Sequence, residues 1–161
     1  MKKLQSPLYR KVRCLCRAKT ILIIAILLLS VTAKAQEATL VVVGNATGVP
    51  VDIKLAELKS ILMGEKQRWK NGNRIIIALM KTNTLIGKNT SSRIYDMTGD
   101  QLNKYWLALV FQGKAQAPTF FNSTSDLESF VAQTPGAIGI VDKAVTDGEV
   151  RCIQVNGQKT F

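Results

Sequence analysis

Hydrophobic and polar positions follow two periodicities along the chain after residue 36. Short continuous apolar runs, rich in β-branched residues, are typical of strands that are covered on both faces. Between them, apolar residues recur every three or four positions, which indicates amphipathic helices. The predicted strands are 39–43, 74–79, 118–121, 137–141 and 150–155, and the predicted helices are 55–62, a segment that ends at about 96, 100–112 and 125–133.

Local signals mark where these elements begin and end. A glycine after an amphipathic run is typical of a helix C-terminus, because glycine adopts the left-handed conformation without steric cost. Aspartate or serine before such a run can cap the first-turn amides. These signals are Gly64, the turn Asn71-Gly72, Asp100, Gly113, the capping box Ser125-x-x-Glu128 and Pro135-Gly136. The alternation predicts an α/β domain with a mostly parallel sheet flanked by helices.

The first 35 residues have the organisation of a secretory signal peptide. The basic segment 1–19 precedes the uncharged apolar run 20–33, and Ala33-Lys34-Ala35 offers small residues for a signal peptidase. We therefore predict cleavage before Gln36, a periplasmic location and a mature domain of residues 36–161. The alternative is a retained anchor, but 14 uncharged residues cover about 21 Å of the roughly 30 Å hydrocarbon core, so stable membrane insertion is not expected.

Charge and composition exclude several functions. The net charge of +11 is concentrated in the leader, where residues 1–35 carry eight basic side chains and no acidic one, and the rest of the chain carries +3. A nucleic-acid partner is therefore not expected. The sequence has no histidine, which excludes Ser-His-Asp and Cys-His nucleophiles and imidazole metal ligands. Neither an enzyme nor a cofactor is expected, and Cys152 is predicted to be a structural cysteine on a strand.

Three segments occur in a characteristic order along the chain. They are the helix 55–64 followed by Trp69 and Asn71-Gly72, the stretch Tyr105-Trp106 with Phe111-Gln112-Gly113 and Pro118, and the run Pro135-Gly136-Ala137-Ile138-Gly139. Each alone is explained by packing, but the ordered set at compatible spacings is much more specific, and it resembles phosphate ABC-transporter substrate-binding proteins. The resemblance covers roughly residues 41–142. It implies a type II periplasmic-binding-protein architecture, of which 126 residues suffice for about one lobe.

The resemblance also implies where an anion would bind. Receptors of this family use an arginine at a strand end and a Ser-Gly-Thr-like loop that leads into a helix. Lys81 falls near the expected arginine, Leu85-Ile86-Gly87 replaces the hydroxyl loop, and Lys88 adds a charge one turn on. Lysine lacks the bidentate fork of arginine, so a phosphate or other oxyanion site here is expected to be weak. The implied ligand-binding residues in this segment are Lys81, Thr82, Asn83, Thr84 and Lys88.

Two interpretations of this segment remain open at the sequence level, a residual oxyanion site and a polar strand-to-helix loop with a Thr cap. The loop 44–48, with Asn45 and Thr47, is a second candidate site or an ordinary turn. Ligands in open α/β sheets collect at the carboxyl ends of strands, so it is expected to face the same crevice as residues 81–84. The aromatic residues predicted to pack in the core or between lobes are Trp69, Tyr105, Trp106 and Phe111, and one of Phe120 and Phe121 is expected to face outward.

Two functional hypotheses follow. The first is an exported solute-binding-like module that binds phosphate or another oxyanion weakly and without catalysis. The second is a single lobe that no longer binds a ligand and docks on another protein of the cell envelope.

Overall fold

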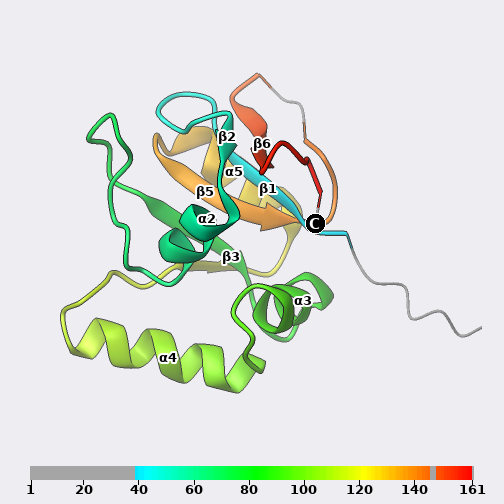
Figure 1. The fold of residues 1–161 in the computed structure, drawn as a ribbon. Helices are drawn as coiled ribbons and strands as arrows, with labels where there is room; N and C mark the ends of the chain where they lie inside the picture. The colour runs from blue at the N-terminus through cyan, green and yellow to red at the C-terminus, as the bar shows by residue number, and fades with distance from the viewer. Residues whose placement is uncertain (1–38, 146–147, 161) are drawn as a thin grey trace, which may run out of the picture. The chain divides into compact units, whose positions relative to one another are not determined.

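Six strands and four helices make up residues 39–145 and 148–160, the part of the chain that the computed structural model describes (Figure 1). In chain order they are β1 (Val41–Asn45), β2 (Asp52–Ile53), α2 (Leu55–Leu62), β3 (Ile76–Met80), α3 (Leu85–Arg93), α4 (Gly99–Phe111), β4 (Thr119–Phe121), α5 (Thr124–Gln133), β5 (Ala137–Val141) and β6 (Val150–Val155). The predicted strands and helices are all present, and β2 is an addition that is too short for periodicity to reveal.

The strands form a sheet in the order β2-β6-β1-β5-β3-β4. Five of them run in one direction, because the pairs β2–β6, β3–β4 and β3–β5 are parallel, while β1 is antiparallel to both β5 and β6. The predicted mostly parallel α/β sheet is confirmed. We call the edge where the five co-directed strands end the C-terminal rim, and the edge where β1 ends the opposite rim.

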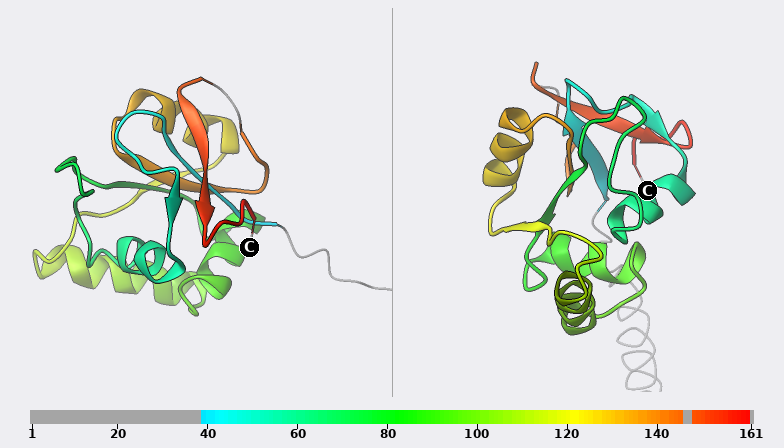
Figure 2. Two further views of the ribbon diagram at one scale, coloured as in Figure 1. Left: turned by 45° about the horizontal axis from the view of Figure 1, so that its top comes forward. Right: turned by 90° about the vertical axis from the view of Figure 1, so that its left-hand side faces the viewer.

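Helices cover both faces of the sheet (Figure 2). α5 lies on one face, α2 and α3 lie on the other, and α4 lies outside, next to α3. All residues of β1 and β5 are buried, as their continuous apolar sequences predict. The helices contribute fully buried side chains such as Leu58 and Leu127, each of which stabilises the fold by about 2 kcal/mol. The core therefore fixes the strand ends on which a binding site would depend.

Two helices begin before the residues that the sequence indicated. The hydroxyl of Thr98 accepts the amide of Gln101 at 3.3 Å, and Gln101 accepts the amide of Thr98 in return, so this pair is the capping box of α4. Ser123 caps α5 in the same position. The predicted caps Asp100 and Ser125 are therefore wrong, because a better N-cap residue with extended backbone lies two residues upstream of each.

Two helices are closed by a glycine in the left-handed conformation, as predicted. Gly64 and Gly113 have φ of +76° and +64°, as expected for residues that close α2 and α4. α3 ends at Arg93 rather than at about Asp96, which itself has a φ of +55°. An aspartate tolerates this conformation better than most residues.

The aromatic side chains are distributed less simply than predicted. Trp69 and Trp106 are buried, as expected. Phe111 is 82% exposed, so of its two predicted positions, in the core or between lobes, the one in the core is wrong. Phe120 and Phe121 are both half-buried instead of one facing outward. The half-buried Tyr105 packs edge-on against Trp106.

The predicted leader, residues 1–35, lies outside the described residues. Within residues 39–145 and 148–160, the helices are all too short or too polar to cross a bilayer. Cys152 lies on β6 as predicted, is half-buried, and its thiol donates to the carbonyl oxygen of Val145 at 3.1 Å.

Candidate functional site

β3 carries Lys81 to the C-terminal rim. The ladder between β3 and β4 pairs Met80 with Phe121, and the amide of Lys81 continues it by donating to the carbonyl oxygen of Phe121 at 2.9 Å. Strand pairing thereby fixes the backbone of Lys81, while its side chain is exposed. The ammonium group therefore lies in solvent at a defined point of the rim.

Thr84 forms the start of α3. Its hydroxyl donates to the carbonyl oxygen of Lys81 at 2.8 Å and accepts the amide of Gly87 at 3.0 Å. The Thr cap that one interpretation of the sequence required is therefore present. Because this hydroxyl already makes both bonds, Thr84 contributes to the site through the position of α3 rather than as a free ligand.

Gly87 lets the first turn of α3 rest on the end of β3. A Cβ at this position would lie 2.1 Å from the carbonyl oxygen of Lys81 and 2.8 Å from that of Met80. Only glycine tolerates such a close approach of a helix to strand backbone. The Leu85-Ile86-Gly87 sequence is thus explained in part by packing, and the helix N-terminus is held against the rim.

The next residues line a shallow hollow of about 270 Å³. Its walls are Lys81, Thr82, Asn83, Asn103 and Phe120. Asn103 comes from α4 and donates its side-chain amide to the hydroxyl of Thr82 at 3.3 Å. Asn103 could not be selected from the sequence, because only the packing of α4 beside α3 brings it to the rim.

The electrostatics of this rim segment favour an anion. Among the four described helices, α3 is the one without an acidic residue in its first turn. Lys81 before the helix and Lys88 within it are both exposed, although Lys88 lines a separate hollow that it shares with Asp96. The amides of Leu85 and Ile86 have no acceptor within the helix, and a helix N-terminus carries a partial positive charge. Leu85, however, is 64% exposed at the position where the sequence resemblance implied a hydroxyl.

The second predicted site, around Asn45 and Thr47, lies elsewhere. Asn45 is opposite Val150 and ends β1, which is antiparallel to its neighbours, so this loop belongs to the opposite rim. The expectation that it shares a crevice with residues 81–84 is therefore wrong. The amide of Asn45 donates to the carbonyl oxygens of Val131 and Ala132 at 2.9 and 2.8 Å, and its oxygen accepts the amide of Thr47 at 2.8 Å.

A hollow of about 300 Å³ lies next to that loop. Asp52 and Glu57 contribute carboxylates to its wall, together with Lys70. Glu57 forms an ion pair with Lys66. Two carboxylates disfavour an anionic ligand there, so the segment 81–88 is the better candidate for an oxyanion.

A buried phenol lies under the two helices that border the site. Tyr95 is 3% exposed, in the connection between α3 and α4. Burial raises the pKa of its hydroxyl well above the usual range, and the nearby Trp106 offsets this only partly. Neither the phenol oxygen nor the Trp106 indole nitrogen meets hydrogen-bond geometry with a partner in the described residues. The phenol is therefore a structural group that remains neutral at physiological pH.

In residues 39–145 and 148–160, no group of three or more Cys, Asp or Glu side chains is placed to hold a metal ion. The candidate site accordingly consists of lysines, hydroxyls, amides and backbone N–H groups.

The architecture matches solved structures of phosphate receptors. An ABC-type phosphate transport receptor from Vibrio cholerae superposes with a TM-score of 0.60 at 16% identity, over 76% of this chain and 48% of the receptor. A putative phosphate ABC transporter substrate-binding protein with bound phosphate from Clostridium perfringens gives 0.56 at 17% identity, over 74% and 46%. PstS from Borrelia burgdorferi gives 0.53 at 20% identity, over 74% and 48%.

The described domain has the fold of these phosphate receptors. It spans about half the length of each. The fold that the sequence resemblance implied is therefore confirmed. Phosphate is the ligand of those receptors, and for this chain the comparison establishes the fold alone. The sequence matches no protein-family model, and no curated protein sequence matches it.

Proposed function

We propose that this chain is an exported, non-catalytic binding module that takes up phosphate or a related oxyanion weakly at the β3–α3 junction, residues 81–88. One observation carries the proposal: on a fold shared with phosphate receptors, two exposed lysines flank the only described helix N-terminus that lacks an acidic residue in its first turn. Lysine charge and first-turn amides together attract oxyanions.

The residues have different roles in this proposal. Lys81 and Lys88 supply charge, and Thr82 and Asn83 supply polar groups in the hollow. Thr84 orients α3. Asn45 and Thr47 are left out, because they lie on the opposite rim. The hollow is open and the receptors' hydroxyl loop is replaced by Leu85, so we expect a dissociation constant in the range of about 10 μM to 1 mM.

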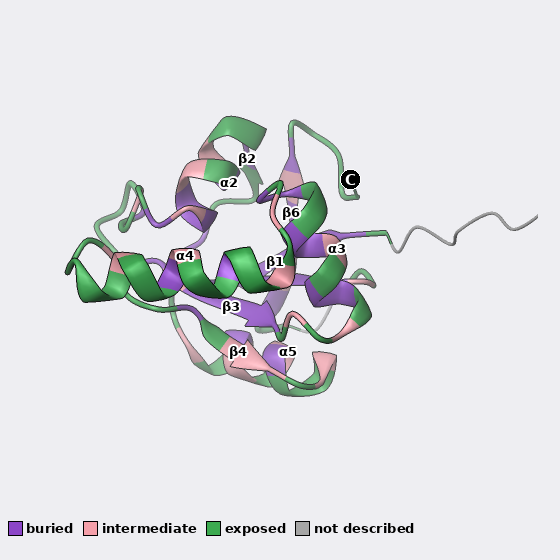
Figure 3. Cartoon of the chain, turned by 90° about the horizontal axis from the view of Figure 1, so that it is seen from below, coloured by how far each residue is buried: buried purple, intermediate pink, exposed green. Residues whose placement is uncertain are grey.

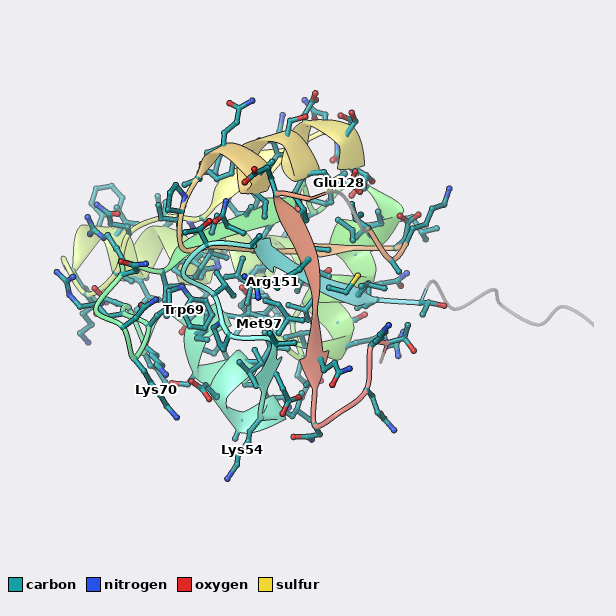
Figure 4. All side chains as sticks on the ribbon, turned by 90° about the horizontal axis from the view of Figure 1, so that it is seen from above. Lys54, Trp69, Lys70, Met97, Glu128 and Arg151 are labelled. Atoms are coloured by element: carbon teal, nitrogen blue, oxygen red, sulfur yellow. The ribbon has the colours of Figure 1, made fainter. Side chains whose placement is uncertain are left out.

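Isothermal calorimetry of the mature protein with phosphate and with sulfate tests the proposal. Lys81→Ala should abolish or greatly weaken binding without changing the circular dichroism spectrum. Lys70→Ala is the matched control, because Lys70 is an exposed lysine that extends away from the opposite side of the domain (Figure 4). An absence of heat with both anions, or equal losses in the two variants, would contradict the proposal.

A second function is favoured by exposed apolar side chains. Leu85 at the candidate site is 64% exposed, and Phe111 on α4 is 82% exposed. Large exposed apolar side chains that cluster on a surface mark interaction sites. The alternative is therefore a module that docks on another envelope protein. A photocrosslinker at position 85 should then capture one defined partner in the envelope, and the same crosslinker at the exposed Val51 should not.

Export is part of the proposed function. The basic segment, apolar run and Ala-x-Ala site at residues 1–35 support it. Mass spectrometry of the protein recovered from periplasm should give a chain that begins at Gln36. A chain recovered from membranes with residues 1–35 attached would favour the retained anchor instead.

A further inference from the structure

The hollow at the C-terminal rim has an aromatic wall in addition to its polar ones. Its volume is about 270 Å³, and Phe120 of β4 lines it beside Lys81 and Asn103. At about 30 Å³ for each water molecule, a space of this size holds about nine waters. Inorganic phosphate, a phosphorus atom with its oxygens, would occupy roughly half of it. The rest of the hollow borders a phenyl ring, which an inorganic anion does not use.

The strand register directs the Phe120 ring to the face of the sheet that carries α3. Neighbouring residues of a strand point to opposite faces. Phe121 packs against Phe130 of α5, with ring centroids 5.2 Å apart, so the Phe120 ring lies on the other face. Figure 3 shows β4 as a largely half-buried strand near β3, whose Leu79 is the register partner of Phe120. Pairing with β3 therefore holds this ring at the wall of the hollow.

The polar lining residues present hydrogen-bond donors. The side-chain amide of Asn103 donates to the hydroxyl of Thr82 at 3.3 Å. A hydroxyl that accepts one hydrogen bond keeps its own hydrogen to donate, so Thr82 can donate into the hollow. Lys81 adds a positive charge, and none of the five described lining residues carries a carboxylate. The hollow therefore combines a cationic, donor-rich lining with an aromatic surface.

We propose that the ligand of this hollow is a phosphoryl group with one compact organic substituent, a phosphonate or a phosphate monoester, and that the substituent packs against Phe120. The phosphoryl oxygens accept hydrogen bonds from Lys81 and Thr82. A flat apolar substituent on the same phosphorus covers the accessible part of the Phe120 ring, and both surfaces are removed from water. This inference rests on the proposed oxyanion binding and adds the class of compound that is bound.

Calorimetry of the mature protein with inorganic phosphate, methylphosphonate and phenylphosphonate tests the inference, at a pH where all three are dianions. Methylphosphonate is the matched ligand, because it carries the same phosphonate group without a ring. Since a pair of aromatic rings contributes about 1 kcal/mol, phenylphosphonate should bind about fivefold more tightly than methylphosphonate. Phenyl phosphate, compared with phenylphosphonate, then assigns the ligand to the esters or to the phosphonates.

Two variants of β4 connect this preference with one ring. Phe120→Ala should lower the affinity for phenylphosphonate to that for methylphosphonate. Phe121→Ala is the matched control, because it removes a half-buried ring from the other face of the same strand, so the preference for phenylphosphonate should remain. If circular dichroism shows that Phe120→Ala does not fold, nuclear Overhauser contacts between the bound phenyl ring and Phe120 of the wild type take its place.

The outcomes separate this inference from the proposed function. Phosphate binding with equal affinities for phenylphosphonate and methylphosphonate would overturn the inference and leave the oxyanion function standing. A preference for phenylphosphonate that persists in a folded Phe120→Ala variant, or a bound ring without contacts to Phe120, would also overturn the inference. Binding of the phenyl compounds without measurable binding of inorganic phosphate would support it. If none of the compounds binds, the oxyanion function itself fails, and this inference fails with it.

Discussion

Replacing Asn45 by alanine tests whether this residue serves structure or ligand binding. The side chain is 2% exposed and makes three hydrogen bonds, two to carbonyl oxygens in the last turn of α5 and one from the amide of Thr47. At about 1 kcal/mol net for each bond, the substitution should lower the free energy of unfolding by about 3 kcal/mol. For a domain of this size that corresponds to roughly 10 °C in melting temperature.

Urea unfolding followed by circular dichroism measures this loss. With a slope of about 2 kcal/mol per molar, the midpoint should fall by about 1.5 M. Thr47→Ala is the control, because Thr47 is exposed and enters this network through its backbone amide, so its midpoint should stay within about 0.3 M of wild type. Equal midpoints for Asn45→Ala and wild type would refute the reasoning, as would a specific loss of phosphate binding in a protein of unchanged stability.

Three further predictions concern the helices around the candidate site. Gly87→Ala should lower the free energy of unfolding in urea by about 3 kcal/mol or more, because its Cβ would meet the carbonyl oxygen of Lys81 at 2.1 Å. Ser92→Ala, on the exposed side of the same helix, is the control and should leave the free energy of unfolding nearly unchanged. Thr84→Ala should lower the free energy of unfolding by about 1 kcal/mol because the N-cap is lost, and Thr84→Ser should retain most of this stability. Equal stabilities of the two variants would contradict the role of the hydroxyl as the N-cap. Burial raises the pKa of Tyr95, so as the pH rises this tyrosine ionises first in the unfolded chain. The free energy of unfolding should therefore be independent of Tyr95 below pH 10 and should fall above it by about 1.4 kcal/mol per pH unit. Tyr95→Phe should flatten this decline, and a decline of unchanged steepness would refute the assignment.

Much of the fold could be predicted because strands that are buried on both faces have continuous apolar sequences. The runs Val41-Val42-Val43 and Ile75-Ile76-Ile77 have no polar positions, and both are strands inside the sheet. The direction of a strand cannot be predicted from this apolar pattern. β1 has the composition of its neighbours and runs against them, and this one reversal moved Asn45 and Thr47 to the other rim.

The site could be predicted only where it is local in sequence. Lys81 and Thr84 follow a recognisable strand and precede a recognisable helix, so their position at a strand end could be predicted. The position of Asn103 could not be predicted, because it reaches Thr82 across a separation of 21 residues. The exposure of Phe111 could have been predicted, because at 100° per residue it lies about 140° around the helix from the buried Trp106.

The reversal of β1 has a practical consequence for how this protein is handled. Leu40 enters the sheet beside the ends of β5 and β6, so the described chain begins and finishes at the edge that also carries Lys81 (Figure 1). With β5 alone between β1 and β3, the entry point is about 10 Å from β3. An affinity tag or a surface-coupling linker joined at residue 39 or at residue 160 would therefore crowd the residues that we propose to bind an anion. An attachment at the exposed turn Asn71-Gly72, on the far edge, would leave them open.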